Sequence, residues 1–354
     1  MKKLLSLFCV LTLCAALFAG CASSNQDGGS GDISDSGAGT SQAGTVDDVP
    51  AADPVNVRVA ALKGPTAMGM VQFMDQVDSG VLADNNYTFS IASAIDEVTP
   101  MLAKGELDIA AIPANVSSVL YNNNSAGFQV LAINTLGVLY IVESGNTVQS
   151  MEDLRGKTIY ASGKGATPEY ALNYILSANG IDPTADVTIE WKSEHAECLS
   201  ALMAQENAIA MLPQPFVTTP QTKSDQIRVA LDLTQEWDAL QEGNETPSAL
   251  ITGVVVARRE FVEQNPDAVS AFLDHYKTSV EYVNSNTDGA AQMVGQYGIV
   301  TAEVAEKALP ACNITFIEGK EMQEKLSGYL AVLFEQNPRS IGGALPGDDF
   351  YFSR

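Results

Sequence analysis

Apolar residues along this chain recur at two different spacings, and segments of the two kinds alternate from residue 55 onward. Short runs of aliphatic and β-branched residues have the length of buried strands. Each is followed by a segment in which apolar residues return every three or four positions, as at Met68, Val71, Met74 and Val77. We predict strands at residues 55–62, 87–92 and 107–112 and helices at residues 68–77, 97–104 and 115–121. This order is typical of a parallel sheet with helices on both faces.

A second strand–helix series begins after a long β-rich stretch at residues 129–142. Its predicted strands are residues 157–161, 187–191, 208–212, 226–233 and 250–257, and its predicted helices are residues 168–178 and 196–205. The pair Asn179-Gly180 is typical of a left-handed helix end. Beyond Phe261 the pattern is almost wholly helical, with predicted helices at residues 266–285, 289–297, 301–309 and 320–336.

The last helices have no predicted sheet of their own, so they need apolar surface from an earlier part of the chain. Two α/β units could be separate domains in series, or two lobes between which the chain crosses twice. The long β-rich runs near residues 129–142 and 250–257 are suitable crossing points. We predict an α/β protein of two lobes, each a mostly parallel sheet flanked by helices. Lobe 1 comprises residues 55–138 and 252–354, and lobe 2 comprises residues 139–251.

Residues 1–21 have the features of a secretory signal. Lys2 and Lys3 precede an apolar run that ends in small residues before Cys21. The ending Leu-Phe-Ala-Gly-Cys resembles a bacterial lipobox, in which the cysteine receives a diacylglyceryl group and becomes the new N-terminus. We therefore predict lipidation, with palmitate-type acyl chains, at Cys21. The alternative is an ordinary cleaved signal in which Cys21 has no role.

Residues 22–54 follow as an acidic segment rich in Ser, Gly, Ala and Asp, with no aromatic residue and no Lys or Arg. Such a segment buries too little apolar surface to offset the entropy of ordering, so we predict a flexible tether. The formal charge of the whole chain is -24. A chain this acidic repels nucleic acid, which we exclude as a partner, and anionic lipid headgroups.

Cysteine and histidine usage argues against a disulfide framework, a metal site and a cofactor. Outside residues 1–21 only Cys198 and Cys312 remain, and they fall in different predicted lobes, so we expect free thiols. No HExxH, paired CxxC or EF-hand spacing occurs. His195 and Cys198 are three apart on a predicted helix, but this spacing rarely gives the geometry of a catalytic pair. We do not expect an enzyme.

Candidate ligand-binding residues follow the predicted strands. Ligands of open α/β sheets bind beyond the carboxyl ends of strands, where helix N-termini offer N–H groups. The candidates in three such turns are Lys63, Gly64, Thr66, Ala67, Met68, Pro113, Asn115, Ser162, Gly163, Lys164, Gly165, Ala166 and Thr167. Glu194, next to His195, and Gln214 follow two further strands. Local roles stay open for several of them, because Thr66 and Asn115 could cap helices and Met68 could belong to the core.

Several segments together resemble one known family. They are Leu62-Lys63-Gly64-Pro65-Thr66, Gly105-Glu106-Leu107-Asp108-Ile109-Ala110, Leu154-Arg155-Gly156-Lys157-Thr158-Ile159, Ala161-Ser162-Gly163-Lys164-Gly165-Ala166-Thr167, Met211-Leu212-Pro213-Gln214-Pro215 and Val255-Val256-Ala257-Arg258-Arg259-Glu260-Phe261. Their order and spacing are similar to the extracytoplasmic solute-binding proteins of ABC importers with the type II periplasmic-binding fold. The resemblance is greatest to the group for nitrate, sulfonates, taurine and thiamine precursors.

This resemblance implies a lipid-anchored receptor at the outer face of the cytoplasmic membrane or in the periplasm, acting as a monomer. Such a receptor captures a small polar or anionic solute between its lobes and delivers it to the transmembrane subunits of an ABC permease. A sulfonate, a nitrate-like anion or a pyrimidine vitamin precursor would fit the polar turns. The alternative is an extracytoplasmic enzyme or a ligand-sensing domain on the same two-lobed fold.

Overall fold

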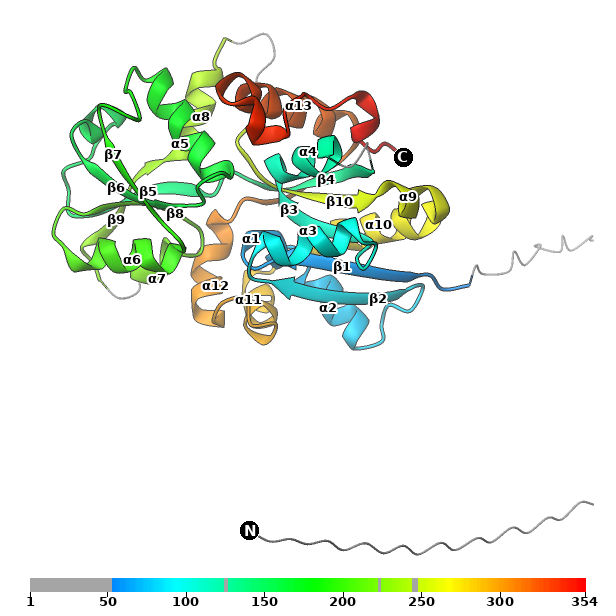
Figure 1. Cartoon of the computed structure of the whole chain (residues 1–354). Helices are drawn as coiled ribbons and strands as arrows, with labels where there is room; N and C mark the ends of the chain where they lie inside the picture. The colour runs from blue at the N-terminus through cyan, green and yellow to red at the C-terminus, as the bar shows by residue number, and fades with distance from the viewer. Residues whose placement is uncertain (1–52, 124–126, 222–223, 244–247) are drawn as a thin grey trace, which may run out of the picture. The chain divides into compact units, whose positions relative to one another are not determined.

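The computed structural model describes residues 53–123, 127–221, 224–243 and 248–354 (Figure 1). The predicted signal, the lipidation site Cys21 and almost all of the predicted tether lie outside the described residues. In the described part, strands and helices alternate much as the apolar pattern predicts, and the strands form two sheets.

The first sheet has six strands in the order β11-β4-β10-β3-β1-β2. β1 pairs in parallel with both β2 and β3, whereas β10 runs antiparallel between β3 and β4. The parallel part therefore comprises the three strands nearest the start of the described chain. The strands are β1 (Asn56–Leu62), β2 (Asn86–Ala92), β3 (Ile109–Pro113), β4 (Phe128–Leu136), β10 (Ile251–Arg258) and β11 (Ile314–Ile317).

The second sheet has five strands in the order β7-β6-β8-β5-β9. β6 pairs in parallel with β7 and β8, and β5 runs antiparallel between β8 and β9. In each sheet one strand, β10 or β5, runs antiparallel between two others, and in the first sheet the end strand β11 also pairs antiparallel with β4. The strands are β5 (Leu139–Ser144), β6 (Thr158–Ser162), β7 (Thr188–Lys192), β8 (Ile209–Pro213) and β9 (Ile227–Asp232).

Helices cover both sheets, and the long C-terminal helices pack on the six-stranded sheet (Figure 1). Apolar side chains at helical spacing, such as Leu326, Leu330 and Leu333 of α13, are fully buried. The helices are α1 (Pro65–Met68), α2 (Val71–Asp78), α3 (Ile95–Ala103), α4 (Ala114–Asn123), α5 (Thr167–Ala178), α6 (His195–Ala204), α7 (Thr218–Gln221), α8 (Leu233–Gln241), α9 (Arg259–Gln264), α10 (Pro266–Ser285), α11 (Thr287–Gln296), α12 (Ala302–Ala308) and α13 (Gly319–Gln336).

Five helical or strand segments differ from the prediction. The helix predicted at residues 68–77 is two helices, α1 and α2, separated at Gly69 and Met70. Helices α7, α8 and α9 and the short strand β11 were not predicted. The left-handed end predicted after α5 is confirmed at Gly180, whose φ is 74°.

The chain passes between the sheets twice, from β4 to β5 and from α8 to β10. Gly137 in the first crossing packs so closely on α8 that a Cβ there would overlap the Thr234 hydroxyl. A third segment supports this crossing, because the Asn313 side-chain amide donates to the Gly137 carbonyl and the Leu136 N–H donates to the Asn313 carbonyl. The predicted lobe boundaries stay a prediction, since Ala52–Arg354 form one compact unit.

Candidate functional site

The predicted polar turns lie at the carboxyl ends of strands from both sheets. β1 and β3 of the six-stranded sheet lead into α1 and α4, and β6, β7 and β8 of the five-stranded sheet lead into α5, α6 and the loop before α7. Parallel strands bring their carboxyl ends to one edge of a sheet, so the turns of each sheet share an edge. The candidate site is therefore the region where these two edges meet.

The turn after β1 contributes Lys63, Gly64 and Thr66. Gly64 has φ 130°, a left-handed value that favours glycine, and precedes Pro65 at the start of α1. The Thr66 hydroxyl donates to the Leu62 carbonyl at 2.7 Å, which holds the turn closed. The Lys63 side chain is exposed.

Ala67 and Met68 are core residues rather than surface residues of this turn. Both side chains are fully buried. The Met68 Sδ atom lies 3.9 Å from the Cys312 Sγ atom, deep in the cluster that packs beneath the six-stranded sheet. Their apolar side chains therefore stabilise the turn from below, and contact of these two residues with a ligand stays a prediction.

A hydrogen-bond network joins the turn after β3 to the start of α5. The Thr167 hydroxyl donates to Asn115 Oδ1 at 3.3 Å and accepts a hydrogen bond from the Tyr329 hydroxyl at 3.2 Å. The Asn115 amide donates to the Ser340 carbonyl at 3.1 Å. Asn115 and Thr167 are each 1% exposed. Two predicted site residues, separated by 52 positions, thus meet as partners of each other.

The glycine-rich turn after β6 is tightly bent. Gly163 and Gly165 have φ 82° and 80°. The Gly165 N–H donates to the Glu169 carboxylate at 2.6 Å, so a side chain of α5 already occupies one of the backbone N–H groups of this turn. The N-cap of α5 is Ala166, and Thr167 is the first helical residue. The Lys164 side chain is exposed.

Ser162 and His195 meet at the ends of β6 and β7. The Ser162 hydroxyl lies 2.5 Å from His195 Nδ1, and Ser162 is only 2% exposed. The His195 ring also packs against Phe216, with ring centroids 4.9 Å apart. Because Nδ1 is engaged by Ser162, Nε2 is the ring atom left for a ligand. Glu194, the neighbouring candidate, is the exposed N-cap residue of α6.

Burial lowers the pKa of His195 to about 4, so its imidazole is neutral near pH 7. The unfolded chain binds this proton near pH 6.5, and the folded chain binds it only near pH 4. We expect the contribution of His195 to the free energy of unfolding to be constant above about pH 7 and to fall as the pH drops from about 6.5 toward 4. Urea denaturation at several pH values measures this slope. In His195→Gln the slope over this range should decrease; an unchanged slope contradicts the assignment.

Gln214 lies at the end of β8, and its peptide bond to Pro215 is cis. Its side chain is 5% exposed and accepts a hydrogen bond from the Thr218 hydroxyl at 2.9 Å. Its N–H donates to the Val138 carbonyl in the first crossing. Gln214 therefore connects the end of β8 to the crossing. Pro113 is the last residue of β3 in the other sheet, the position that Pro213 holds in β8.

Asn134 is a polar residue of this region that the sequence did not single out. It is 1% exposed in β4, and its amide donates to the Thr66 carbonyl at 3.3 Å. Thr135 follows and donates its hydroxyl to Asn134 Oδ1 at 3.2 Å. Gly253 of β10 leaves the room for both, because a Cβ there would lie 2.5 Å from Asn134 Oδ1. A buried amide inside an apolar strand was the signal that could have identified this position.

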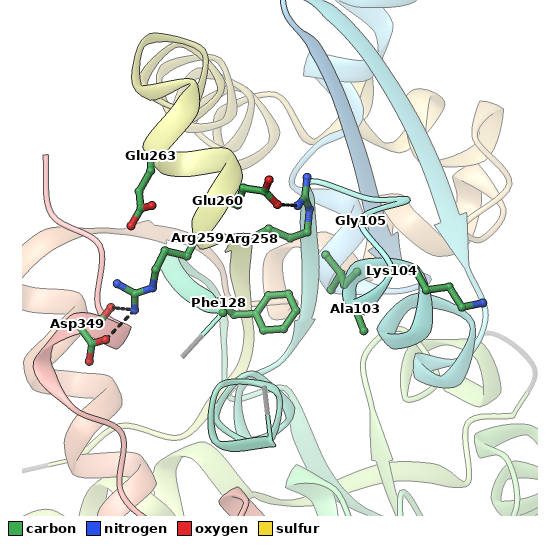
Figure 2. Close-up of a pocket in the computed structure, with 11 residues that line it drawn as sticks. Ala103, Lys104, Gly105, Phe128, Arg258, Arg259, Glu260, Glu263 and Asp349 are labelled. Atoms are coloured by element: carbon green, nitrogen blue, oxygen red, sulfur yellow. Dashed lines mark hydrogen bonds and ion pairs between the residues drawn. The ribbon is translucent and has the colours of Figure 1, made fainter. Parts of the chain in front are cut away.

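A cavity of about 600 Å³ lies at the opposite edge of the six-stranded sheet, where β3 and β4 begin and β10 ends (Figure 2). Arg258 of this cavity is paired with Asp108 and Glu260, and Arg259 is paired with Asp349. Their charges are matched by carboxylates, and the cavity is remote from the predicted turns. We therefore assign this cavity to the ion-pair network of the sheet rather than to the candidate site.

The described residues offer little for metal or redox chemistry. Among them, no group of three or more His, Cys, Asp or Glu side chains is arranged to hold a metal ion. Cys198 and Cys312 are both buried free thiols, as predicted. In the same described part, no helix combines the length and apolar character needed to cross a bilayer.

Two α/β sheets joined by two crossings, with polar strand ends from both sheets in contact, define the class of periplasmic-binding-type solute receptors. The family model described as "ABC transporter, phosphonate, periplasmic substrate-binding protein" matches residues 73–307, more than half of the chain. The chain therefore belongs to that family of ABC importer substrate-binding proteins, which confirms the family and the fold class expected from sequence. No curated protein matches the chain.

Solved structures share this fold at low sequence identity. An ABC transporter protein from Parabacteroides distasonis has a TM-score of 0.70 and 21% identity over 85% of this chain and 100% of its own. The aliphatic sulphonate binding protein SsuA from Escherichia coli has a TM-score of 0.66 and 16% identity over 84% and 96%. The alkanesulfonate-binding SsuA from Xanthomonas axonopodis pv. citri, bound to MOPS, has a TM-score of 0.62 and 15% identity over 84% and 96%.

Proposed function

We propose that this protein captures a small polar or anionic solute between the strand ends of its two sheets and delivers it to an ABC permease. The observation that carries the proposal is the contact between Asn115 and Thr167, which links turns from the two sheets. A solute that touches both turns gains contacts only when the turns are close, so binding favours the closed arrangement. The permease would then recognise the closed form. We propose a monomer without a cofactor.

The solute class that this geometry favours is an oxyanion or a polar heterocycle recognised by hydrogen bonds. The names of similar proteins mention phosphonate, sulphonate and MOPS. In this chain the turns offer hydroxyl, amide and backbone groups together with exposed Lys63 and Lys164. Most arginines are engaged elsewhere in ion pairs, namely Arg58, Arg155, Arg228, Arg258, Arg259 and Arg354. A phosphonate, a sulfonate, a nitrate-like anion or a pyrimidine precursor fits this donor set better than a ligand that needs an arginine clamp.

Binding without chemistry is favoured over an enzymatic function on the same site. The Ser162 hydroxyl contacts both His195 and Cys198, and this cluster resembles a nucleophile with its base. Burial raises the pKa of the Cys198 thiol, so the reactive thiolate is disfavoured. The described hydrogen bonds of His195 include none to a carboxylate that would orient its ring for catalysis.

A thermal-shift screen tests the proposed solute class. We expect stabilisation by at least one compound among phosphonates, sulfonates, nitrate and pyrimidines, because a ligand that binds only the folded state raises the melting temperature. The hit should bind Thr66→Ala and Gln214→Ala more weakly, by about tenfold in Kd. Thr278→Ala is the matched control, since its hydroxyl also donates to a carbonyl four residues earlier but at an exposed position of α10. An equal loss of affinity in Thr278→Ala, or a screen in which no compound stabilises the protein, rejects the proposed solute site.

We also propose that acyl chains on Cys21 anchor the protein to the outer face of the membrane. Each buried methylene contributes about 0.8 kcal/mol, so two or three acyl chains hold a protein at a bilayer. Cys21→Ser in the producing bacterium should move the protein from the membrane fraction to the soluble fraction after cell disruption. Retention of the variant in the membrane fraction contradicts lipid anchoring.

A further inference from the structure

The outer strand of the six-stranded sheet has one edge without a strand partner among the described residues. β2 lies at the end of the sheet and pairs only with β1 (Figure 1). Asn86 donates its N–H to the Val55 carbonyl, and the Ala92 carbonyl accepts from the Lys63 N–H. Even-numbered residues thus direct their backbone groups to β1. Because directions alternate along a strand, Tyr87, Phe89 and Ile91 direct theirs outward.

A second cavity, of about 480 Å³, adjoins this edge. Its walls include the side chains of the same three residues, together with Met74 of α2 and Tyr297. Phe73 of α2 packs under the strand, with its ring 4.9 Å from that of Tyr87 and 5.1 Å from that of Phe89. A strand added beyond β2 would place every second side chain on this face of the sheet, next to the cavity.

β2 differs from the other edge strands in having none of the usual features that discourage pairing. β11 has four residues and an irregular register with β4. β7 contains the ion pair of Glu190 with Lys192, and β9 contains Arg228 and a register shift against β5. By contrast, the seven residues of β2 (Asn-Tyr-Thr-Phe-Ser-Ile-Ala) include no charge and no proline, and their pairing with β1 is regular.

Charge decides which occupant fits this edge. Asp78 lines the cavity and accepts a hydrogen bond from the Tyr297 hydroxyl at 2.8 Å, and Asp75 lies close to the same hydroxyl. A second copy would bring the same acidic groups to the interface, in a chain of charge -24. Residues 22–53 of the chain itself are also acidic and lack Lys and Arg. Asp75 and Asp78 would therefore repel either a second copy of the chain or residues 22–53, whereas they would attract a basic segment.

We propose that the outer edge of β2 and the adjoining cavity bind an extended, basic segment of a partner protein, which adds to the sheet as a strand and places an apolar side chain in the cavity. Backbone hydrogen bonds to Tyr87, Phe89 and Ile91 supply the affinity, and the cavity selects the side chain. This surface is separate from the solute site and does not depend on the proposed solute.

A labelled synthetic heptapeptide that alternates lysine with valine and tyrosine is the probe, and fluorescence anisotropy with the full chain measures binding. We expect saturable binding, with an affinity that falls about tenfold when the residues of the peptide are reordered to remove the alternation. Ile91→Lys should weaken binding by a similar factor, because it adds positive charge at the cavity. Val229→Lys, an exposed position on the edge strand β9, is the matched control and should bind normally. If circular dichroism shows that Ile91→Lys is unfolded, the wild-type protein is instead titrated with a peptide that is N-methylated along its pairing edge. This peptide should not bind.

Three results would overturn the proposal. Equal binding of the reordered peptide, or of the N-methylated peptide, would reduce the interaction to charge alone. Concentration-dependent dimers that Ile91→Lys abolishes would assign the edge to a second copy. Slow amide exchange at Tyr87, Phe89 and Ile91 in the free protein would show that the chain itself already covers the edge.

Discussion

Replacing Asp108 with alanine will lower the free energy of unfolding by about 3 kcal/mol, near the lower end of the range for breaking a buried ion pair. Asp108 precedes β3 and is 2% exposed. Its carboxylate accepts hydrogen bonds from Arg58 Nε at 2.8 Å and from Arg258 Nη2 at 3.0 Å, so the variant leaves two guanidinium groups without their shared partner. Arg58 is 40% exposed, so water can solvate part of the charge that is left. Urea denaturation measures the loss.

The control for this prediction is Asp274→Ala, which breaks an exposed pair with Arg354 and should cost about 0–1 kcal/mol. Burial alone would raise the pKa of Asp108, but hydrogen bonds from Arg58 and Arg258 hold it below its ordinary value. The contribution of Asp108 is therefore present above about pH 4 and is lost as the pH falls through the lowered pKa. The difference between the two variants should shrink at acid pH; equal losses at pH 7 would contradict a buried network.

Most elements of the fold were readable from the spacing of apolar residues, and the exceptions have local causes. α10 and α13 are long and amphipathic, so a helical period is unmistakable. α8 begins at Leu233 directly after β9, with Asp232 as its N-cap, so no loop residues separate the two patterns. β11 has four residues and lies between helical segments, which is too short to show an alternation. Pairing of β10 between β3 and β4 depends on tertiary contacts that a periodic pattern does not encode.

The candidate site was predictable in its positions but not in its partners. Strand ends followed by Gly, Ser, Thr or Asn mark the turns, and Thr66, Asn115, Ser162 and Thr167 all lie there. The sequence could not show that Asn115 and Thr167 bond to each other, since 52 positions separate them. Nor could it show that Glu169 bonds to the Gly165 amide, because a carboxylate in the first turn of a helix reads equally as an exposed charge.

Replacing Gly253 with alanine will weaken binding of the solute found in the screen by about tenfold. Gly253 lies at the start of β10, opposite Pro113 and Thr135. A Cβ there would lie 2.5 Å from Asn134 Oδ1 and 2.6 Å from Thr66 Cγ2. Both side chains are buried in packed surroundings, so relief of the overlap displaces the turn after β1. Isothermal titration of the solute into the wild type and the variant measures the change in Kd.

Gly295→Ala separates this effect from a general loss of stability. A Cβ at position 295 in α11 would lie 3.1 Å from the Ala302 N atom, a tight contact remote from the turns. Extra volume at packed positions costs about 1–3 kcal/mol, so we expect both variants to melt at lower temperature. Only Gly253→Ala should change the Kd, because only its neighbours belong to the turn after β1. If both variants bind the solute as the wild type does, Thr66 and its turn do not contact it, and the solute site must be sought at the turn after β3 and among the residues of the five-stranded sheet.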